Sequence, residues 1–290
     1  MVAVVADSAS NLPGGLAGAL GVEVVPLWLR LGDDQYRDGV DMPPGRFYER
    51  LSEVGVMAST AAPSPADFLE AFGRTRQRDV VCITVASTMS GTHNAARLAA
   101  ERFDGTVVVV DSTNASMAEG FAVIEAARAA SAGGSLDEVA GRARRVGQRT
   151  VLFATVSTFE FLKRSGRVNA LQAYAATVLG IEPVFSFRGG DAAPVARTRS
   201  RRRAVDRLVA ETLRAIGGRP AHVAVMHAAV AAEALSLMDE LAERADLVER
   251  HVVEVTPVIG AHTGPGMLAT ATFVEPDEPG RRDGPDHPGG

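Results

Sequence analysis

Strand-length apolar runs alternate with helical patterns along most of the chain, and this alternation limits the fold more than any other feature. Runs of this kind begin at Val2, Val80, Thr106 and Val151, and helical patterns lie between them. Strands that alternate with helices predict an α/β fold with a largely parallel sheet. For the first half of the chain we therefore predict a doubly wound α/β domain.

The second half keeps the alternation but adds a hairpin pattern. Ile181 to Phe187 and Ala193 to Arg199 flank Arg188-Gly189-Gly190-Asp191, whose glycines favour a tight turn. We therefore predict a smaller two-layer α/β domain with a mixed sheet. The expected division is an N-terminal domain over residues 1–149, a C-terminal domain over residues 150–276 and a flexible tail over residues 277–290.

Capping patterns and apolar periodicity place several individual elements. Ser64 and Ser135 each have the sequence context of a helix N-cap. A helix is expected from about Gly91 to Arg102, and Leu171 to Leu179 also has a helical pattern. Val24 to Leu31 predicts one continuous strand.

The composition is that of an ordinary globular protein, with 46% hydrophobic residues, 22% charged residues and a net charge of −5. The single cysteine, Cys82, excludes an internal disulfide and a cysteine-based zinc site, and its apolar neighbours predict burial. The apolar runs are far shorter than the ~20 residues of a membrane-spanning helix. The start of the chain lacks the basic segment of a signal peptide. We expect a cytoplasmic protein without an integral membrane segment.

Positive charge is concentrated between Lys163 and Arg207, a segment with ten basic and three acidic side chains. Its Arg-rich part, Arg197 to Arg207, leaves nucleic-acid binding as one hypothesis. However, Arg201-Arg202-Arg203 opens a helix that soon turns apolar, and the chain as a whole is acidic. We therefore favour a solvated helix face and expect no nucleic-acid partner.

Three polar loops follow predicted strands: Asp7 to Ser10, Ser87 to Thr92, and Asp111 to Thr113. In open parallel sheets, ligands bind beyond the carboxyl ends of the strands. The second loop leads into a helix, whose free N–H groups and dipole favour an anion. Ser90 and Thr92 add hydroxyl groups, and Gly91 leaves the backbone accessible. The alternative is that Ser90 only caps its helix.

A second candidate segment is Gly260 to Gly266, where three glycines and a proline surround His262. These residues predict an irregular, rigid loop that presents an imidazole to a ligand. His227 ends a strand and better fits a core histidine. The histidine spacing matches no metal motif, so no metal site is expected. A serine hydrolase that acts on acyl esters through Ser90 and His262 stays open as an alternative.

Six motifs follow one another along nearly the whole chain. They are Val4–Ser8 with Asn11–Pro13, Val25–Leu27 with Tyr36–Asp41, Thr60–Pro65, Ser87–Thr92, Leu162–Arg167 and Gly260–Gly266. Together they resemble the DegV family, the fatty-acid-binding proteins. The chain departs from the family pattern at Ala61, Ala62, Ser165 and Glu182.

The resemblance implies two α/β domains with one long-chain fatty acid buried between them. It implies that Thr60, Ser90, Gly91 and His262 bind the carboxylate, and that Arg167 lies in the surface that meets a separate, ATP-dependent kinase subunit. On this interpretation the chain is a non-catalytic lipid-binding subunit, and the kinase converts the bound fatty acid to an acyl phosphate. No cofactor and no metal are implied besides the bound lipid.

Overall fold

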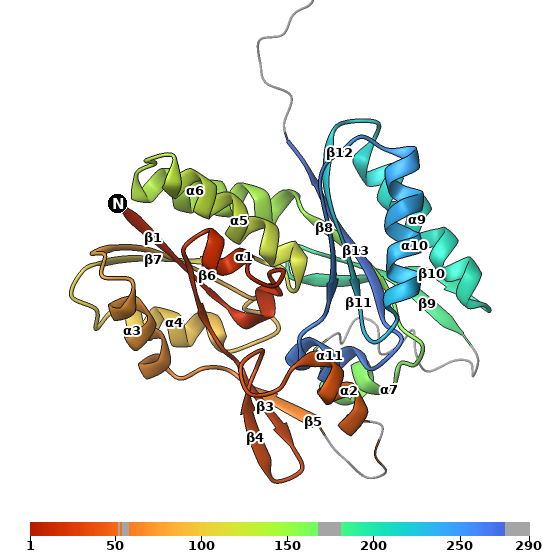
Figure 1. Ribbon diagram of the computed structural model, residues 1–290, viewed down its shortest axis with the longest axis horizontal. Helices are drawn as coiled ribbons and strands as arrows, with labels where there is room; N and C mark the ends of the chain where they lie inside the picture. Colours follow the sequence, from red (N-terminus) through yellow and green to blue (C-terminus); the bar gives the residue numbers. More distant parts are fainter. Residues whose placement is uncertain (52, 54–57, 168–180, 276–290) are drawn as a thin grey trace, which may run out of the picture.

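The computed structural model describes residues 1–51, 53, 58–167 and 181–275. Its N-terminal half contains a four-stranded sheet of order β2-β1-β6-β7, in which every neighbouring pair is parallel (Figure 1). The strands are β1 (Val2–Asp7), β2 (Val22–Val25), β6 (Asp79–Thr84) and β7 (Thr106–Asp111). The predicted parallel sheet of the first half is thus confirmed.

Helices cover both faces of this sheet, as a doubly wound domain requires. They are α3 (Pro65–Arg74), α4 (Thr92–Ala100), α5 (Met117–Ser131) and α6 (Leu136–Arg149). Successive side chains of a strand point to opposite faces. Val5 and Cys82 therefore pack against α3 and α4, whereas Val4 and Val81 pack on the side of α5 and α6. Cys82 is fully buried, as predicted.

The C-terminal half contains a six-stranded mixed sheet of order β10-β9-β8-β13-β11-β12. The strands are β8 (Val151–Thr155), β9 (Glu182–Arg188), β10 (Asp191–Thr198), β11 (Ala221–His227), β12 (Leu247–Glu254) and β13 (Leu268–Val274). Only β11 and β12 are parallel neighbours; the other pairs are antiparallel. The predicted mixed sheet and its hairpin across Gly189-Gly190 are confirmed.

Helices α9 (Arg201–Ile216) and α10 (Ala231–Arg244) cover one face of the six-stranded sheet. The other face packs against α5 and α6, so these two helices form a layer between the two sheets (Figure 1). Most of α5 is buried for this reason, and Ala118, Ala122 and Ala126 are 0% exposed. Small side chains let a helix approach two sheets at once, which explains the Ala-rich sequence of α5.

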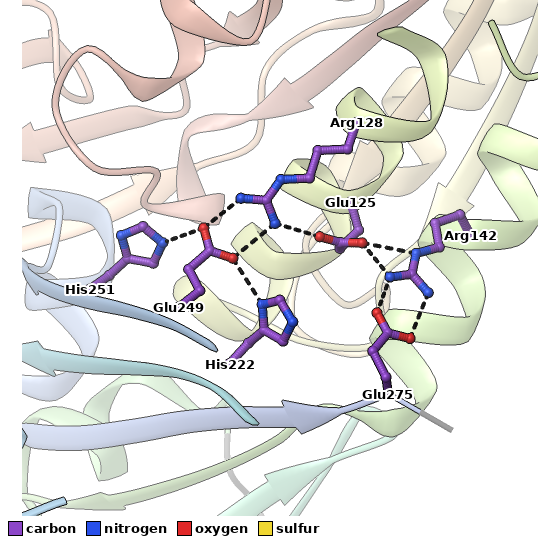
Figure 2. A network of polar contacts seen from close by, with 7 residues as sticks. All are labelled: Glu125, Arg128, Arg142, His222, Glu249, His251 and Glu275. Carbon is purple, nitrogen blue, oxygen red and sulfur yellow. Dashed lines mark hydrogen bonds and ion pairs between the residues drawn. The ribbon is translucent and has the colours of Figure 1, made fainter. Parts of the chain in front are cut away.

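Charged side chains join the two halves along this middle layer (Figure 2). Arg128 of α5 pairs with Glu125 at 2.6 Å and with Glu249 of β12 at 2.7 Å. Glu249 also accepts hydrogen bonds from the rings of His222 and His251 at 2.9 and 3.0 Å. Burial alone would raise the pKa of the Glu249 carboxyl, but the bonds from His222, His251 and Arg128 lower it overall. Arg142 of α6 also forms ion pairs with Glu125 and with Glu275.

A third, antiparallel sheet of order β4-β3-β5 projects from the N-terminal half (Figure 1). Its strands are β3 (Trp28–Leu31), β4 (Asp34–Arg37) and β5 (Ala58–Ala61). The prediction of one strand over Val24 to Leu31 is therefore wrong. The chain leaves the parallel sheet at Val25 and enters the small sheet at Trp28, with Pro26 between them. Proline lacks the N–H that a strand ladder needs, so it separates the two strands.

Short helices pack beside the small sheet: α2 (Pro44–Leu51), α7 (Glu160–Ser165) and α11 (Pro257–Thr263). The prediction of an irregular loop around His262 is wrong, because this residue lies in the last turn of α11. A Cβ on Gly260 would lie 2.5 Å from the Tyr48 hydroxyl and 2.8 Å from the Phe47 ring. Glycine at this position therefore allows α11 to pack closely against α2.

The predicted helix over Leu171 to Leu179 and the tail over residues 277–290 lie outside the described residues. The expected boundary near Arg149 stays a prediction, with β8 beginning the second sheet at Val151. Short helical turns at η1 (Ser8–Ser10) and α1 (Leu16–Ala19) complete the first half. Among the helices that the structure describes, none is long and apolar enough to cross a membrane.

Candidate functional site

A cavity of about 540 Å³ lies beyond the carboxyl ends of β1 and β6, and residues of β5, α7 and α11 also line it. We call it the outer cavity. All five residues that the sequence singles out for the carboxylate or the partner line it, namely Thr60, Ser90, Gly91, Arg167 and His262. Segments up to about 200 residues apart along the chain thus meet around one space. The location agrees with the general position of ligand sites in open parallel sheets.

Thr60 and His262 contact each other in the lining of the outer cavity. The hydroxyl oxygen of Thr60, on β5, lies 2.8 Å from Nε2 of His262, at the end of α11. Burial, together with the positive charge of Arg167, lowers the pKa of His262 to about 4. The imidazole is therefore neutral at pH 7, so it can donate one hydrogen bond and accept another.

Ser90 and Gly91 line the outer cavity at the start of α4. Gly91 directly precedes this helix and has no side chain with which to cap it, and the alternative that Ser90 caps the helix stays open. The Ser90 hydroxyl accepts a hydrogen bond from the Thr92 N–H at 3.3 Å and lies 2.8 Å from the Thr92 hydroxyl. A Cβ placed on Gly91 would meet no atom within 4 Å. The start of α4 therefore borders the cavity, with the Ser90 hydroxyl on the N–H of Thr92, and a helix N-terminus is a suitable place for an anion.

Arg167 follows α7, which ends at Gly166 in the left-handed conformation. The guanidinium donates a hydrogen bond from Nη1 to the carbonyl oxygen of Ser165 at 2.6 Å. Ser165 in turn donates from its hydroxyl to the carbonyl oxygen of Leu162 at 2.8 Å. Arg167 thus adds positive charge to the wall of the outer cavity, close enough to act on His262.

A second, apolar cavity of about 100 Å³ continues from the outer cavity between the two halves. We call it the inner cavity. The two cavities adjoin each other, because six residues line both of them: Met89, Ala115, Ser165, Arg167, Ile259 and His262. The rest of the inner cavity is formed by side chains of the six-stranded sheet and its loops, including Leu152, Ala154, Phe185, Phe187, Met226 and Met267. A polar outer space and an apolar inner space suit a ligand with one charged end and one hydrocarbon end.

The sequence reasoning missed several polar residues of the outer cavity, including His93 and Asn94 on the first turn of α4. They follow Ser90 by three and four residues, and this helical spacing places them on the same face of α4 as Ser90. Thr88, in the predicted loop, donates a hydrogen bond to the carbonyl oxygen of Gly190 at 2.8 Å. This bond joins the loop before α4 to the turn of the β9–β10 hairpin in the other half.

In the two other predicted ligand loops, the acidic side chains accept hydrogen bonds from backbone N–H groups of the protein itself. Both carboxylate oxygens of Asp7 accept backbone hydrogen bonds, from Ala9 and Val85. Asp111 accepts hydrogen bonds from the N–H groups of Thr113 and Ser87. From the first of these loops, Ala9 reaches the outer cavity.

Alternative sites find less support in the geometry. Within the described ranges, no hydrogen bond joins Ser90 to His262, and a pKa of about 4 makes this histidine a weak general base. His227 is buried at the end of β11, where burial lowers its pKa, in keeping with a core histidine. In the Arg-rich segment, Arg201 pairs with Glu182 and Glu233.

One group of described side chains has the donor spacing of a metal site. Glu125, His222 and Glu249 each offer an atom within 4.8 Å of the others. However, the guanidinium groups of Arg128 and Arg142 already engage these carboxylates (Figure 2). We therefore interpret the group as an ion-pair network between the two halves.

Comparison with known proteins gives a consistent result over the whole chain. The model of the DegV family, described as uncharacterised proteins, matches residues 1–275. A DegV domain-containing protein of Streptomyces coelicolor is 35% identical over 271 residues, which cover 92% of this chain and 96% of that protein.

Solved structures show the same relationship. A DegV family protein from Thermus thermophilus, described for its fatty acid binding, has a TM-score of 0.89 and 31% identity over 94% of this chain and 99% of its own. A DegV lipid binding protein from Thermotoga maritima has a TM-score of 0.85 and 25% identity over 94% and 98% of the two chains. On these matches and its own fold, the chain belongs to the DegV family.

Proposed function

We propose that this protein binds a long-chain fatty acid, with the carboxylate in the outer cavity and the hydrocarbon chain in the inner cavity. One observation carries the proposal: the outer cavity, whose lining includes Thr60, Ser90 and His262, adjoins the apolar inner cavity at His262. The fatty acid binding described for the Thermus thermophilus relative supports it. The carboxylate ligands would be Thr60, Ser90, Gly91 and His262.

The chemistry of the two cavities agrees with such a ligand. A carboxylate that leaves water needs strong hydrogen-bond donors, and hydroxyl groups, a helix N-terminus and an imidazole N–H supply them. The hydrocarbon chain gains about 0.8 kcal/mol for each CH₂ that it buries. A chain of ~16 carbons therefore gains on the order of 10 kcal/mol, before the costs of ordering.

We further propose that the protein is a non-catalytic subunit that presents the carboxylate to a separate kinase. In that reaction a carboxylate oxygen attacks the γ-phosphorus of ATP, the bond to the ADP oxygen breaks, and acyl phosphate and ADP form. Arg167 lies at the wall of the outer cavity, beside Ser165 and the basic residues of α7. Its position supports a role in docking the kinase close to the carboxylate.

Fatty acid binding is tested with protein purified under mild conditions and analysed by native mass spectrometry. We expect the added mass of a co-purified fatty acid, or a complex after addition of oleate. An apo mass that stays unchanged with oleate would exclude the proposal. Hydrolysis of a p-nitrophenyl ester that Ser90→Ala abolishes would favour the serine hydrolase instead.

The carboxylate site is tested with Ser90→Ala, for which Ser236→Ala on the outer face of α10 is the matched control. Ser236 is exposed and bonds only within its helix. Loss of a hydrogen bond to a charged group corresponds to roughly a 10- to 100-fold weaker Kd for oleate. The control should bind as the wild type does, and equal binding by Ser90→Ala would remove this residue from the site.

Gly91→Ala probes the same wall by a different route. The added Cβ meets no protein atom within 4 Å, so the variant should fold as the wild type does. A weaker Kd for oleate would then come from contact between the methyl group and the ligand. Unchanged affinity would place the carboxylate away from this helix N-terminus.

The docking role is tested with Arg167→Ala, compared with Arg244→Ala on α10. Arg244 pairs with Glu240 on the surface of α10 and lines neither cavity. We expect Arg167→Ala to retain fatty acid binding but to lower the rate of acyl phosphate formation by the kinase. A variant that instead loses lipid binding would show that Arg167 is a carboxylate ligand.

A further inference from the structure

Two acidic residues of the sequence motifs, Asp7 and Asp38, contact neither cavity but are almost completely buried, with 0% and 1% exposure. We propose that Asp7 and Asp38 are positioning residues, which hold the Ser90 loop and the His262 helix at a fixed separation around the carboxylate. The inference rests on the proposed function and assigns a role to residues that this function leaves unexplained.

Asp7 fixes the segment that leads to Ser90. It ends β1, and one carboxylate oxygen accepts a hydrogen bond from the N–H of Ala9 at 2.9 Å. The other oxygen accepts from the N–H of Val85 at 2.8 Å. Val85 directly follows β6 and begins the stretch that passes through Ser90 into α4. Asp7 therefore holds the first residue of this stretch to the end of the neighbouring strand.

Asp38 fixes the helix that carries His262. One of its oxygens accepts a hydrogen bond from the N–H of Val258, in the first turn of α11, at 3.1 Å. Thr256, the N-cap residue of α11, makes no side-chain capping bond to its own helix. Asp38 thus satisfies a free N–H of this helix from a segment 220 residues away in sequence. Only one further turn of helix separates this bond from His262.

Ser8, which follows Asp7 directly in the chain, bonds to the carboxylate of Asp38. Its hydroxyl donates to the second oxygen of Asp38 at 2.7 Å and accepts from the N–H of Leu27 at 3.0 Å. Asn11 strengthens the connection, because its side-chain oxygen accepts from the N–H of Thr256 at 3.2 Å, just before α11. The loop after β1 is therefore bonded both to the start of the Ser90 stretch and to the start of the His262 helix.

Carboxyl groups suit this role because each has two oxygens that can accept hydrogen bonds from two different segments. Burial is unfavourable for a charged carboxylate, and it therefore raises the pKa of Asp7 to about 7 and that of Asp38 to about 6. Hydrogen bonds to the two site-bearing segments offset this cost. An apolar residue would avoid the cost but would leave the N–H groups of Val85 and Val258 without these acceptors.

The test compares Asp38→Asn with wild type in binding two ligands of the same chain, oleate and oleyl alcohol. The neutral amide has one acceptor oxygen in place of two and is a weaker acceptor than the carboxylate, so the bonds from Ser8 and from the N–H of Val258 cannot both be kept as in wild type. Loss of one such bond corresponds to about a tenfold weaker Kd for oleate, whereas the alcohol, which lacks the carboxylate, should change less than about threefold. NMR chemical shifts of the His262 ring should move in this variant.

Thr212→Val is the matched control for a lost buried hydrogen bond. The Thr212 hydroxyl lies 2.6 Å from that of Thr270, between α9 and the six-stranded sheet and remote from both cavities. This variant should lower stability but leave both Kd values unchanged. Ser8→Ala is a second, milder change, which removes the hydrogen bond from Ser8 to Asp38. It should repeat the selective loss of oleate binding.

The possible results separate the two proposals. If Asp38→Asn and Ser8→Ala weaken both ligands equally, or weaken neither, these residues only stabilise the fold and the positioning role is wrong. If wild type binds oleate no better than oleyl alcohol, the carboxylate site itself is wrong. Selective loss of oleate binding in both variants supports the inference.

Discussion

The hydroxyl of Thr60 lies 2.8 Å from Nε2 of His262, although 202 residues separate them in the chain. This pair brings together the small antiparallel sheet and the last turn of α11 in the lining of the outer cavity, and His262 also lines the inner cavity. A bound carboxylate in the outer cavity would meet both groups at once. Each of them orients the other, so their effects on binding should be coupled.

We expect His262→Ala and Thr60→Val each to weaken the Kd for oleate roughly 10- to 100-fold, as for a lost hydrogen bond to a charged group. The double variant should lose less than the sum of the two free-energy changes, because the first substitution already misplaces the second group. Isothermal titration of the four proteins measures the coupling. Strictly additive losses would show that the two residues bind independently.

Ala154→Leu should shorten the acyl chain that the protein accepts. Ala154 is 3% exposed and lines the inner cavity, so the larger side chain takes space from the hydrocarbon. Loss of two buried CH₂ groups corresponds to about 1.6 kcal/mol, or roughly a 15-fold weaker Kd for long chains. Short chains should bind as before.

The measurement for Ala154→Leu is a Kd series for saturated acids of increasing length. Ala193→Leu makes the same substitution on the exposed strand β10, away from the inner cavity, and should leave the series unchanged. An equal loss at every chain length in Ala154→Leu would mean that the hydrocarbon does not reach this residue.

Glu249→Gln should destabilise the contact between the two halves. Glu249 accepts hydrogen bonds from His222, His251 and Arg128 at the middle layer (Figure 2). The substitution weakens the hydrogen bonds from His222 and His251 and leaves Arg128 with Glu125 as its ion-pair partner, which we expect to lower the free energy of unfolding by about 2 kcal/mol. Glu240→Gln breaks the exposed pair with Arg244, and there the loss should be only about 0.5 kcal/mol. Urea unfolding measures the free energy of unfolding of both variants. Equal losses would show that the network between the two halves stabilises the protein no more than an exposed ion pair does.

Asp7→Asn should change how stability depends on pH. Burial raises the pKa of Asp7 from 3.8 to about 7, with a smaller contribution from the charge of Asp38. The folded protein therefore holds a proton that the unfolded chain releases. The stabilisation from this group is full below about pH 4 and is lost as the pH rises through about 7. Relative to wild type, Asp7→Asn should gain on the order of 3 kcal/mol between pH 4 and pH 8.

Urea unfolding of wild type and Asp7→Asn at several pH values checks this prediction. The difference between the two proteins isolates Asp7 from the other acids, including the buried Glu119, whose pKa is also raised by burial and by the charge of Asp7. A difference that stays constant from pH 4 to pH 8 would show that the Asp7 carboxyl is ionised throughout.

The strands and helices with strong local signals were predictable from the sequence. Capping boxes at Ser64 and Ser135 are present as the sequence indicates, and the apolar runs form buried strands. Gly189-Gly190 forms the expected hairpin turn. In these places local chemistry and global packing favour the same structure.

The missed elements lack such local signals. Strand β4 is mostly polar and exposed, so it has no apolar run, and its pairing with β3 follows from the turn between them. α11 is only seven residues long and contains Gly260, a poor helix former whose value here is close packing against α2. His262 and Ser90 were found from composition and motif, but only the three-dimensional structure shows that Thr60, rather than Ser90, contacts the imidazole.

The helical layer shared by the two sheets has a consequence for how the molecule folds. Phe187, Met226 and Phe273 of the six-stranded sheet belong to the same core as Val4 and Ile83 of the parallel sheet, with α5 and α6 between them. Neither half has a complete hydrophobic core without these two helices. Separation of the six-stranded sheet from α5 and α6 would expose an apolar face of that sheet to water. The two halves should therefore unfold in a single cooperative transition rather than as separate foldons.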